Sequence, residues 1–439
     1  MRILSPMRPL LAAAVLGVLS WPAFGQQKTI VLRAARMFDG HEMRTPGLVV
    51  VSGSRILGVG SRASIPAAAQ VIDFGEATLS PGFIDAHTHL SFMYNADYRQ
   101  GLLDSLQQTI PEQTVRATDN LKKTLMAGIT TARDVGSSDF MDVGLRNAAA
   151  AGVIPGPRML VAVHSIGATG GHCDDQNGFR AGLFGRETGP EQGVINTPDE
   201  GRRAVRLNIK YGADVIKICA TGGVLSLTDE VDIPQLTQDE MNAIVDEAHT
   251  LRKKTAAHAH GGEGARRAVR AGIDSIEHGA FLDDETLDLM KTRGTYYIPT
   301  LMAIEGGKEI LAKGGYPPPV ASKMTAAVES LNQVVRKAIS KGLKIGMGTD
   351  AAVYPHGRNT EEFHLLTALG MSPLDALRAA TSVDAELLGT QDRIGTLEPG
   401  KLADVIAMPG DPIQNIRQTE KVFFVMKEGA IYRDDRDRR

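Results

Sequence analysis

Between residues 81 and 390, short apolar runs alternate with amphipathic helical stretches, and this alternation limits the folds that the chain can adopt. The apolar runs lie at residues 83–87, 130–134, 158–164, 215–218, 255–258, 275–278, 295–300 and 344–350. Helical stretches separate most of them, at residues 112–127, 198–211, 237–254, 263–271, 284–293 and 320–341. Strands joined by crossover helices predict an α/β fold, a parallel (β/α)8 or TIM barrel. The active site of such a barrel lies at the C-terminal ends of its strands.

The two ends of the chain share a different pattern, in which short β-branched runs are separated by turn residues. These runs lie at residues 29–32, 48–51, 55–60 and 71–73, and again at 403–408, 422–426 and 430–432. We therefore expect residues 26–80 and 391–435 to form one composite β-sandwich. The barrel would then occupy residues 81–390.

The first 25 residues have the pattern of a secretory signal peptide. Arg2 and Arg8 are followed by an apolar segment at residues 10–21, and Ala23-Phe24-Gly25 is a small-x-small cleavage pattern. The apolar segment is too short to span a bilayer, although an uncleaved anchor helix is the alternative. We therefore expect cleavage near Gly25 and export to the periplasm or the medium, without stable membrane insertion.

Charge and cysteine content narrow the classes of partner. The chain has 48 Lys and Arg against 51 Asp and Glu, a formal charge of -3, so nothing indicates a nucleic-acid partner or a strongly basic membrane surface. Only two cysteines are present, Cys173 and Cys219. One pair is no scaffold for a chain of this length, and we expect two separate thiols rather than a bridge.

Two irregular insertions are expected in the barrel. Residues 164–197 form a Gly-rich stretch after the third apolar run, too long for an ordinary connection, which predicts a lid or substrate loop. Residues 308–325, with two glycines and Pro317-Pro318-Pro319, predict a second irregular segment.

Two histidines, His87 and His89, end the first apolar run of the barrel. Side chains alternate faces along a strand, so both imidazoles project to the same side. Two imidazoles at the mouth of a strand can share one metal ion. Taken alone, the pair is equally consistent with two polar surface residues.

Four further polar residues end later apolar runs: Lys217, His258, His278 and Asp350. A charged Lys217 alone in an apolar strand would be costly. Its deprotonated amine can instead have taken up CO2 to give a carbamate that bridges two metal ions; the alternatives are an ion pair with an aspartate or an amine that reaches solvent. The two histidines are metal ligands or hydrogen-bonded core residues. Asp350 is a metal ligand that also takes a proton from bound water, or a helix N-cap.

In this chain order, the histidine pair, the lysine, the two histidines and the aspartate resemble the amidohydrolase superfamily in its two-metal form. The resemblance extends to residues 79–82 (LSPG), which enter the barrel, and to residues 395–404, which leave it. It implies two ligand sets that share an N6-carboxylated lysine: His87, His89, Lys217 and Asp350 for one ion, and Lys217, His258 and His278 for the other. The histidine-rich set favours Zn²⁺.

Several motifs resemble the imidazolonepropionase-like group, and more narrowly its Xaa-Pro dipeptidase and carboxypeptidase members and the ochratoxin-hydrolysing amidohydrolases. The motifs are TGGH at 169–172, ATGGV at 220–224, AHAHG at 257–261 and SIEHG at 275–279. The resemblance implies hydrolysis of an amide bond to a C-terminal amino acid, in Xaa-Pro dipeptides, N-acyl amino acids or aromatic amides that release phenylalanine. A hydroxide bridging the two ions would attack the carbonyl, and Asp350 would carry the proton to the leaving nitrogen. A homo-oligomer, for example an octamer, is also implied.

A substrate carboxylate needs a cation or hydrogen-bond donors. The candidates are His164, His172, Gly223, Val224, His260 and His356, with Arg358 beside the last. Each is also consistent with an ordinary loop hydrogen bond. Tyr296 and Tyr297 would line the pocket or pack in the core.

Three other functions compete with this interpretation. A hydrolase of cyclic amides or esters would have the same ligands and a different pocket. A single-metal deaminase needs no lysine on the fourth strand, so Lys217 argues against it. A metal-free scaffold protein loses ligands, whereas all six positions are filled here.

Overall fold

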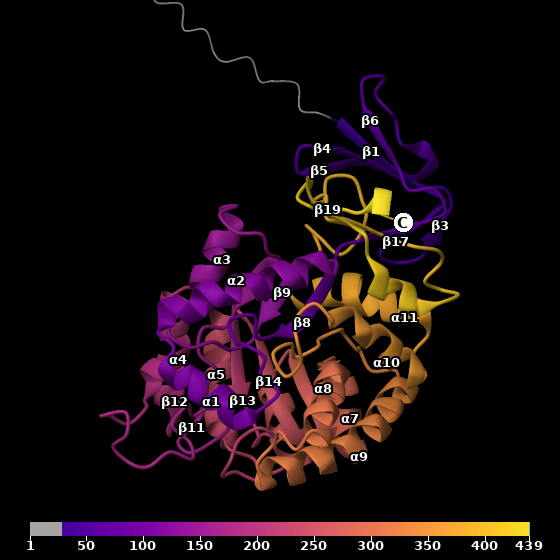
Figure 1. Ribbon diagram of the computed structural model, residues 1–439. Coiled ribbons are helices and arrows are strands. Elements are labelled where there is room, and N and C mark those ends of the chain that lie inside the picture. The colour runs from indigo at the N-terminus through magenta and orange to yellow at the C-terminus, as the bar shows by residue number, and fades with distance from the viewer. Residues whose placement is uncertain (1–28, 439) are drawn as a thin grey trace, which may run out of the picture.

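The computed structural model describes residues 29–438, and its central body is a barrel of parallel strands surrounded by helices (Figure 1). One run of strands has the order β10-β9-β8 and another the order β13-β14-β15-β16. Their bounds are β8 (Phe83–Thr88), β9 (Ile129–Asp134), β10 (Arg158–Val161), β13 (Val215–Cys219), β14 (Lys254–Gly261), β15 (Ser275–Phe281) and β16 (Tyr296–Ile298). All neighbouring pairs are parallel.

Backbone hydrogen bonds close the barrel at both gaps between these runs. Ile166, beyond the end of β10, donates to Lys217 O at 2.8 Å and accepts from Cys219 N at 2.8 Å. The eighth position is filled by residues 344–351, where Gly346 N donates to Tyr297 O at 3.0 Å. On the other side, Ala86 N donates to Met347 O at 2.8 Å. The predicted TIM barrel is therefore confirmed, although its eighth segment forms only isolated bridges.

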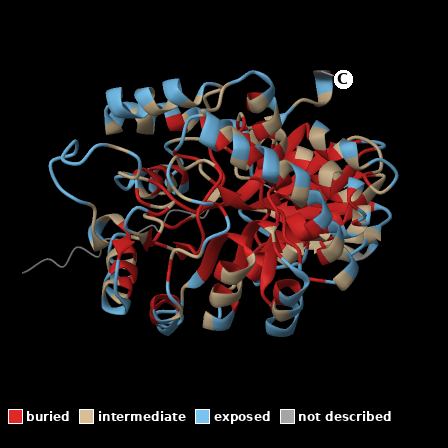
Figure 2. Cartoon of the chain, turned by 90° about the horizontal axis from the view of Figure 1, so that it is seen from below, coloured by how far each residue is buried: buried red, intermediate tan, exposed pale blue. Residues whose placement is uncertain are grey.

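Helices cover the outside of the barrel. Their bounds are α1 (Tyr98–Gln107), α2 (Ile110–Met126), α3 (Met141–Ala150), α4 (Pro198–Lys210), α5 (Gln238–Thr250), α6 (Gly262–Ala271), α7 (Asp284–Arg293), α8 (Leu301–Ala312), α9 (Pro318–Lys341), α10 (Glu362–Ala368), α11 (Pro373–Arg378) and α12 (Asp384–Leu387). Thr237 and Glu240 form a reciprocal capping box at the start of α5. Buried residues concentrate in the interior, and exposed residues lie on outward helix faces (Figure 2).

The expected irregular insertion at residues 308–325 is wrong. Helix α8 continues to Ala312 and α9 begins at Pro318, so only a short turn separates them. The three prolines lie at the N-cap and in the first turn of α9. A proline lacks an N–H that is unsatisfied at these positions anyway, so the run starts a helix here.

Two sheets pack beside the barrel, and one of them joins both ends of the chain (Figure 1). The four-stranded sheet contains β5 (Arg55–Val59), β4 (Gly47–Ser52), β1 (Thr29–Ala34) and β6 (Gln70–Asp73). The six-stranded sheet contains β19 (Ala430–Asp434), β18 (Phe424–Lys427), β17 (Val405–Met408), β7 (Thr78–Pro81), β2 (Arg36–Phe38) and β3 (Met43–Arg44). Leu32, Val49, Leu79, Val405 and Phe424 share one buried cluster between the sheets. An extra β unit built from both ends, as predicted, therefore accompanies the barrel.

The Gly-rich loop after β10 folds back on the barrel. Its strands β11 (Gly167–Ala168) and β12 (Val194–Ile195) pair in parallel, and Cys173 forms a disulfide with Cys219 at the end of β13, with a Cα–Cα distance of 6.0 Å. The expectation of two separate thiols is wrong. The cysteines are 46 residues apart, and only the return of the loop over β13 brings them together.

Among the residues that the structure describes, no helix has the length and apolar character needed to cross a bilayer. The predicted signal peptide at residues 1–25 lies outside that part of the chain.

Candidate active site

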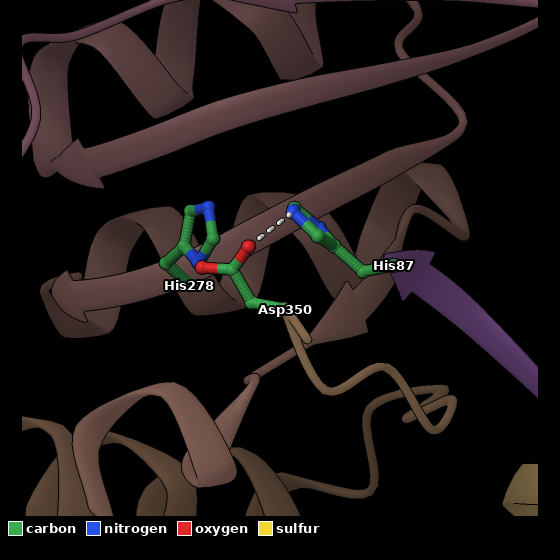
Figure 3. Close-up of side chains that lie close together, drawn as sticks. All are labelled: His87, His278 and Asp350. Carbon is green, nitrogen blue, oxygen red and sulfur yellow. Dashed lines mark ion pairs between the residues drawn. The ribbon is translucent and has the colours of Figure 1, made fainter. Parts of the chain in front are cut away.

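A cavity of about 390 Å³ opens at the C-terminal ends of the barrel strands, and the predicted metal ligands gather there. Five of the six line it: His89, Lys217, His258, His278 and Asp350. The sixth, His87, is fully buried at the end of β8, with its ring centroid 4.7 Å from that of His278. His87, His278 and Asp350 each offer a ligand atom, all within 4.8 Å of one another, and Figure 3 shows the three side chains close together. The structure thus brings all six residues to one site.

The hydrogen-bond partners of His87 and His89 determine which ring nitrogen of each histidine is free to bind a cation. Nδ1 of His87 lies 2.7 Å from Oε2 of Glu277, and Nδ1 of His89 lies 2.9 Å from Gly136 O. Both partners are acceptors, so each Nδ1 carries the proton and each Nε2 has a lone pair. Both Nε2 atoms lie 3.5 Å from the same oxygen, Oδ1 of Asp350. Three acceptor atoms that face one another without a proton between them form a favourable position for a cation.

The other two histidines face the cavity from neighbouring strands. Nε2 of His258 donates to Gly222 O at 3.1 Å, which leaves its Nδ1 as the lone pair. Nδ1 of His278 lies 2.8 Å from Oγ1 of Thr300, so its Nε2 remains available. The two ring centroids are 4.6 Å apart. His278 and Asp350 have φ angles of +68° and +58°, a left-handed conformation that is uncommon outside glycine and clusters at functional sites.

Lys217 is 3% exposed, on β13. No hydrogen bond or ion pair joins its amine to any residue that the structure describes, unlike the other buried lysine of a strand, Lys427, which donates to Gly156 O at 2.6 Å. Burial lowers the pKa of the Lys217 amine to about 8, against the opposing effect of Glu277 and Asp350. Neither an aspartate ion pair nor a solvent-exposed amine, the two alternatives for this residue, is observed.

The protonation states fit a transition-metal centre. Burial lowers the pKa of His87, His258 and His278 well below the usual histidine value, so all three rings are neutral, as metal ligands must be. Burial also raises the pKa of Asp350 to about 6. Imidazole nitrogens together with a carboxylate form a donor set that suits Zn²⁺ and related divalent ions.

Several residues that support the site were missed from the sequence. Oε1 of Glu277 accepts from Arg133 at 2.8 Å, and both side chains are fully buried inside the barrel. Asp85 accepts from Thr349 Oγ1 at 2.6 Å and Asn359 Nδ2 at 2.8 Å, which ties β8 to the eighth segment beside Asp350. The signal was a charged residue in an otherwise apolar strand, as Asp85 and Glu277 both are.

The predicted substrate-binding residues divide into two groups. His164, His172, Val224 and His260 line the cavity. His356 does not, because its Nε2 is turned to Phe92 O at 3.2 Å. The neighbouring Arg358 is held in ion pairs with glutamates.

Gly223 does not line the cavity either, and its N–H, offered as a carboxylate donor, points to Oδ2 of Asp229 at 3.3 Å. A Cβ on Gly223 would lie 2.1 Å from the ring of His172, so only glycine fits behind that histidine. Tyr297 packs in the core and donates to His278 O at 2.9 Å.

A network of loop and helix residues fixes His172 beside His258, one of the predicted metal ligands. Its ring centroid lies 4.2 Å from that of His258, and its Nδ1 lies 3.0 Å from Ser226 Oγ. Ser226 in turn bonds to Asp229. Lys323 of α9 donates to both residues, to Ser226 O at 2.7 Å and to Asp229 Oδ1 at 3.2 Å. The loop after β13 is thus anchored to the outer helix layer.

The remaining walls of the cavity differ in polarity. The apolar wall comes from the loops after β8 and β13, from α8 and α9 and from the segment after Asp350: Phe92, Met93, Leu225, Ile304, Met324 and Val353. The polar wall comes from the loops after β9 and β10: Ser137, Ser138, Ser165 and Gln192. The cavity therefore offers both apolar and polar contacts to a substrate.

We predict that reduction of the Cys173–Cys219 disulfide raises KM several-fold and leaves the metal content unchanged. The bond links two cysteines that are 46 residues apart and holds the loop that carries His172. A cross-link of this length stabilises the folded state by about 3–4 kcal/mol. Steady-state kinetics with and without reductant, together with proteolysis of residues 178–187, will measure the effect. A Cys173→Ser/Cys219→Ser variant should have the same KM as the reduced protein, and reductant should not change that KM. An unchanged KM after full reduction contradicts the prediction.

Comparisons with known proteins agree with this geometry. Residues 78–433 match the Amidohydrolase family. The chain is 31% identical over 420 residues to ochratoxinase from Aspergillus niger, covering 90% of this chain and 84% of that protein. It is 26% identical over 365 residues to imidazolonepropionase from Cutibacterium acnes, covering 82% and 83%. The crystal structure of a Xaa-Pro dipeptidase with methionine bound in its active site superposes with a TM-score of 0.87 at 38% identity, covering 92% of this chain and all of that one.

The family match includes all six converging side chains, and the relatives extend over most of the described chain. The resemblance read from the motifs is confirmed, and with it a hydrolase that acts on amide bonds. The donor atoms gather at the strand ends of the barrel, and the family match extends from β7 to the C-terminal sheet. The chain therefore belongs to the amidohydrolase family.

Proposed function

We propose that the protein is a two-metal amidohydrolase that releases a C-terminal amino acid from Xaa-Pro or related dipeptides, or from N-acyl amino acids, including aromatic amides of the ochratoxin type. One observation carries the metal-dependent part of this proposal. The Nε2 lone pairs of His87 and His89 both face Oδ1 of Asp350 at 3.5 Å, an arrangement that is unfavourable unless a cation lies among them.

A carbamate on Lys217 would complete the centre. The amine lines the cavity beside His258 and His278, and no described residue neutralises it. Reaction with CO2 would convert the buried amine into an anionic ligand with two oxygens, so that one set of donors includes His87, His89 and Asp350 and the other His258 and His278. We propose Zn²⁺ at both positions, since imidazole and carboxylate-like oxygens are its usual ligands.

When bound, the two cations would lower the pKa of a water molecule and polarise the substrate carbonyl. Asp350 is placed to accept the proton of the attacking water, because its carboxylate borders the cavity beside both histidine groups. The same carboxyl then protonates the leaving nitrogen, which converts it into a neutral amine and allows the C–N bond to break. The loop after β10 lines the cavity beside these groups.

The pocket supports the substrate class. Phe92, Leu225 and Met324 are part of an apolar wall that suits a phenylalanine, methionine or proline side chain. His164, His172 and His260 offer imidazole groups to a carboxylate or carbonyl at the same cavity. The names of two relatives, a Xaa-Pro dipeptidase and an ochratoxinase, indicate substrates of this class.

A screen of Xaa-Pro and Xaa-Phe dipeptides, N-acyl amino acids and ochratoxin-type amides, with detection of the freed amino acid, tests the proposal. Metal analysis of the same preparation is expected to find close to two ions per chain. Protein that holds no metal and stays inactive after reconstitution with Zn²⁺ would falsify the hydrolase assignment.

The alternative is a hydrolase of cyclic amides, and the imidazolonepropionase relative favours it. It would use the same metal ligands, so only the substrate distinguishes the two functions. Hydrolysis of lactams or imidazolones without release of any C-terminal amino acid would select this alternative.

We also propose export, a homo-oligomer and the division into a barrel at residues 81–390 and a composite sandwich of residues 26–80 and 391–435. The disulfide supports export, because such bonds persist in oxidising compartments. Size-exclusion chromatography with light scattering tests the oligomer, and the N-terminal sequence of the secreted protein tests cleavage near Gly25.

A further inference from the structure

We propose that Glu277 and Arg133 form a positioning pair inside the barrel that fixes the tautomer of His87 and so presents its Nε2 lone pair to the metal. The inference rests on the proposed function, because it requires a metal ion at His87. Glu277 itself contacts neither the cavity nor the converging oxygen of Asp350; it acts through the histidine.

The pair lies in a closed part of the barrel interior. Glu277, Arg133 and His87 are all fully buried. Oε2 of Glu277 lies 2.7 Å from His87 Nδ1, and Oε1 accepts from Arg133 Nη2 at 2.8 Å and from Ser275 Oγ at 2.5 Å. Arg133 Nε donates to Ala86 O at 2.5 Å, which ties the guanidinium to β8, the strand that carries His87. Every polar group of this interior set has a partner except His87 Nε2.

Hydrogen-bond roles then determine the proton. An ionised carboxylate only accepts, so Nδ1 of His87 must donate and its Nε2 must be unprotonated. The Arg133 guanidinium pairs with the Glu277 carboxylate in a place where a lone charge would be costly. A carboxylate on the far nitrogen also raises the basicity of a ligating imidazole. The pair therefore orients the His87 ring and makes its Nε2 a stronger donor to a metal ion.

The other ligand histidines are held differently. His89 and His258 donate to the backbone carbonyls of Gly136 and Gly222, and His278 meets the hydroxyl of Thr300. Among these four, His87 alone depends on an ionised side chain. A single substitution can therefore reverse its tautomer without changing the backbone.

Glu277→Gln is the test. The amide has one acceptor oxygen, which Arg133 and Ser275 will hold, so its NH2 group will face His87 Nδ1 and force the proton onto Nε2. We expect the affinity for Zn²⁺ to fall by about 10–100-fold, measured by chelator competition and metal content. Glu247→Gln is the matched control, since Glu247 also accepts from an arginine, Arg206, at 2.7 Å, but on the outer helices; it should keep wild-type affinity.

A second variant separates positioning from general damage. Arg133→Met/Glu277→Gln removes the competing guanidinium, so the amide oxygen can turn to His87 and the affinity should recover most of its wild-type value. Wild-type affinity in folded Glu277→Gln overturns the inference, and so does a folded double variant that binds as weakly as the single one.

¹⁵N-histidine NMR of the metal-free protein reads the tautomer directly, with His87→Gln to assign the signal. A proton on Nδ1 in the wild type supports the inference, and a proton on Nε2 overturns it even if no variant folds. Wild-type protein that binds no metal would instead contradict the proposed function, and the tautomer measurement would still stand.

Discussion

Lys217→Ala is expected to lower kcat by at least about 10³-fold, because the loss of a ligand shared by two ions removes several kcal/mol of transition-state stabilisation. The amine lines the cavity with no partner among the described residues, so its removal leaves no buried group unsatisfied and the barrel should fold. Metal content should drop from about two ions per chain. Steady-state kinetics and metal analysis of the purified variant measure both effects.

Chemical rescue separates the carbamate from a simple structural role. Short carboxylic acids such as acetate or propionate fit the space left by the lysine side chain and can supply the two missing oxygens, so they should restore part of the activity. Lys427→Ala is the matched control, because Lys427 is also buried in a strand but lies in β18, outside the barrel. Full activity in Lys217→Ala would show that the two-metal assignment is wrong.

The convergence of the six side chains could be predicted because the position of each depends on a short-range pattern. A histidine, lysine or aspartate that ends an apolar run must lie at the C-terminal edge of a parallel barrel, whichever helices connect the strands. His89, Lys217 and Asp350 are far apart in sequence, yet the fold alone brings them to one cavity. Residues 344–351 do fill the eighth position of the barrel, as predicted, but they form no regular strand and pair only at isolated bridges.

The errors arose where the outcome depended on three-dimensional packing. The Cys173–Cys219 bond depends on how the Gly-rich loop returns over β13, and no local pattern encodes that path. His356 was selected as a polar residue beyond the last strand, but its turn directs it to Phe92 O. Pro317 and its neighbours marked a break, and the break proved to be the start of α9.

Charged residues inside the barrel were the main omission. Asp85 and Glu277 stand in apolar strands, where alternation alone assigns them an inward or outward face and no partner. Their roles need knowledge of the residues opposite: Thr349 and Asn359 for Asp85, and Arg133 for Glu277. Since buried charges are rarely left unpaired, a charged residue in such a strand predicts a partner elsewhere in the barrel, although not which one.

Asp350→Asn is expected to lower kcat by about 10²–10⁴-fold, the range typical of the loss of a general acid–base group. An amide keeps one oxygen that can still contact a cation, but it cannot accept the proton of the attacking water or return it to the leaving nitrogen. Asparagine also tolerates the left-handed conformation of this position, where φ is +58°. The backbone should therefore remain in place, and the metal-free variant should unfold at the wild-type temperature.

Asp142→Asn provides the comparison, because burial raises the pKa of the Asp142 carboxyl to about 6 as it does for Asp350, yet Asp142 lies on α3 and is turned to the backbone N–H of Val163. Its kcat should stay close to wild type even if its stability falls. A small loss of kcat in Asp350→Asn, with metal content intact, would assign the proton transfer to another group at the cavity. His172 would then be the first residue to replace, since its ring lies against His258 and its Nδ1 is held by Ser226 Oγ.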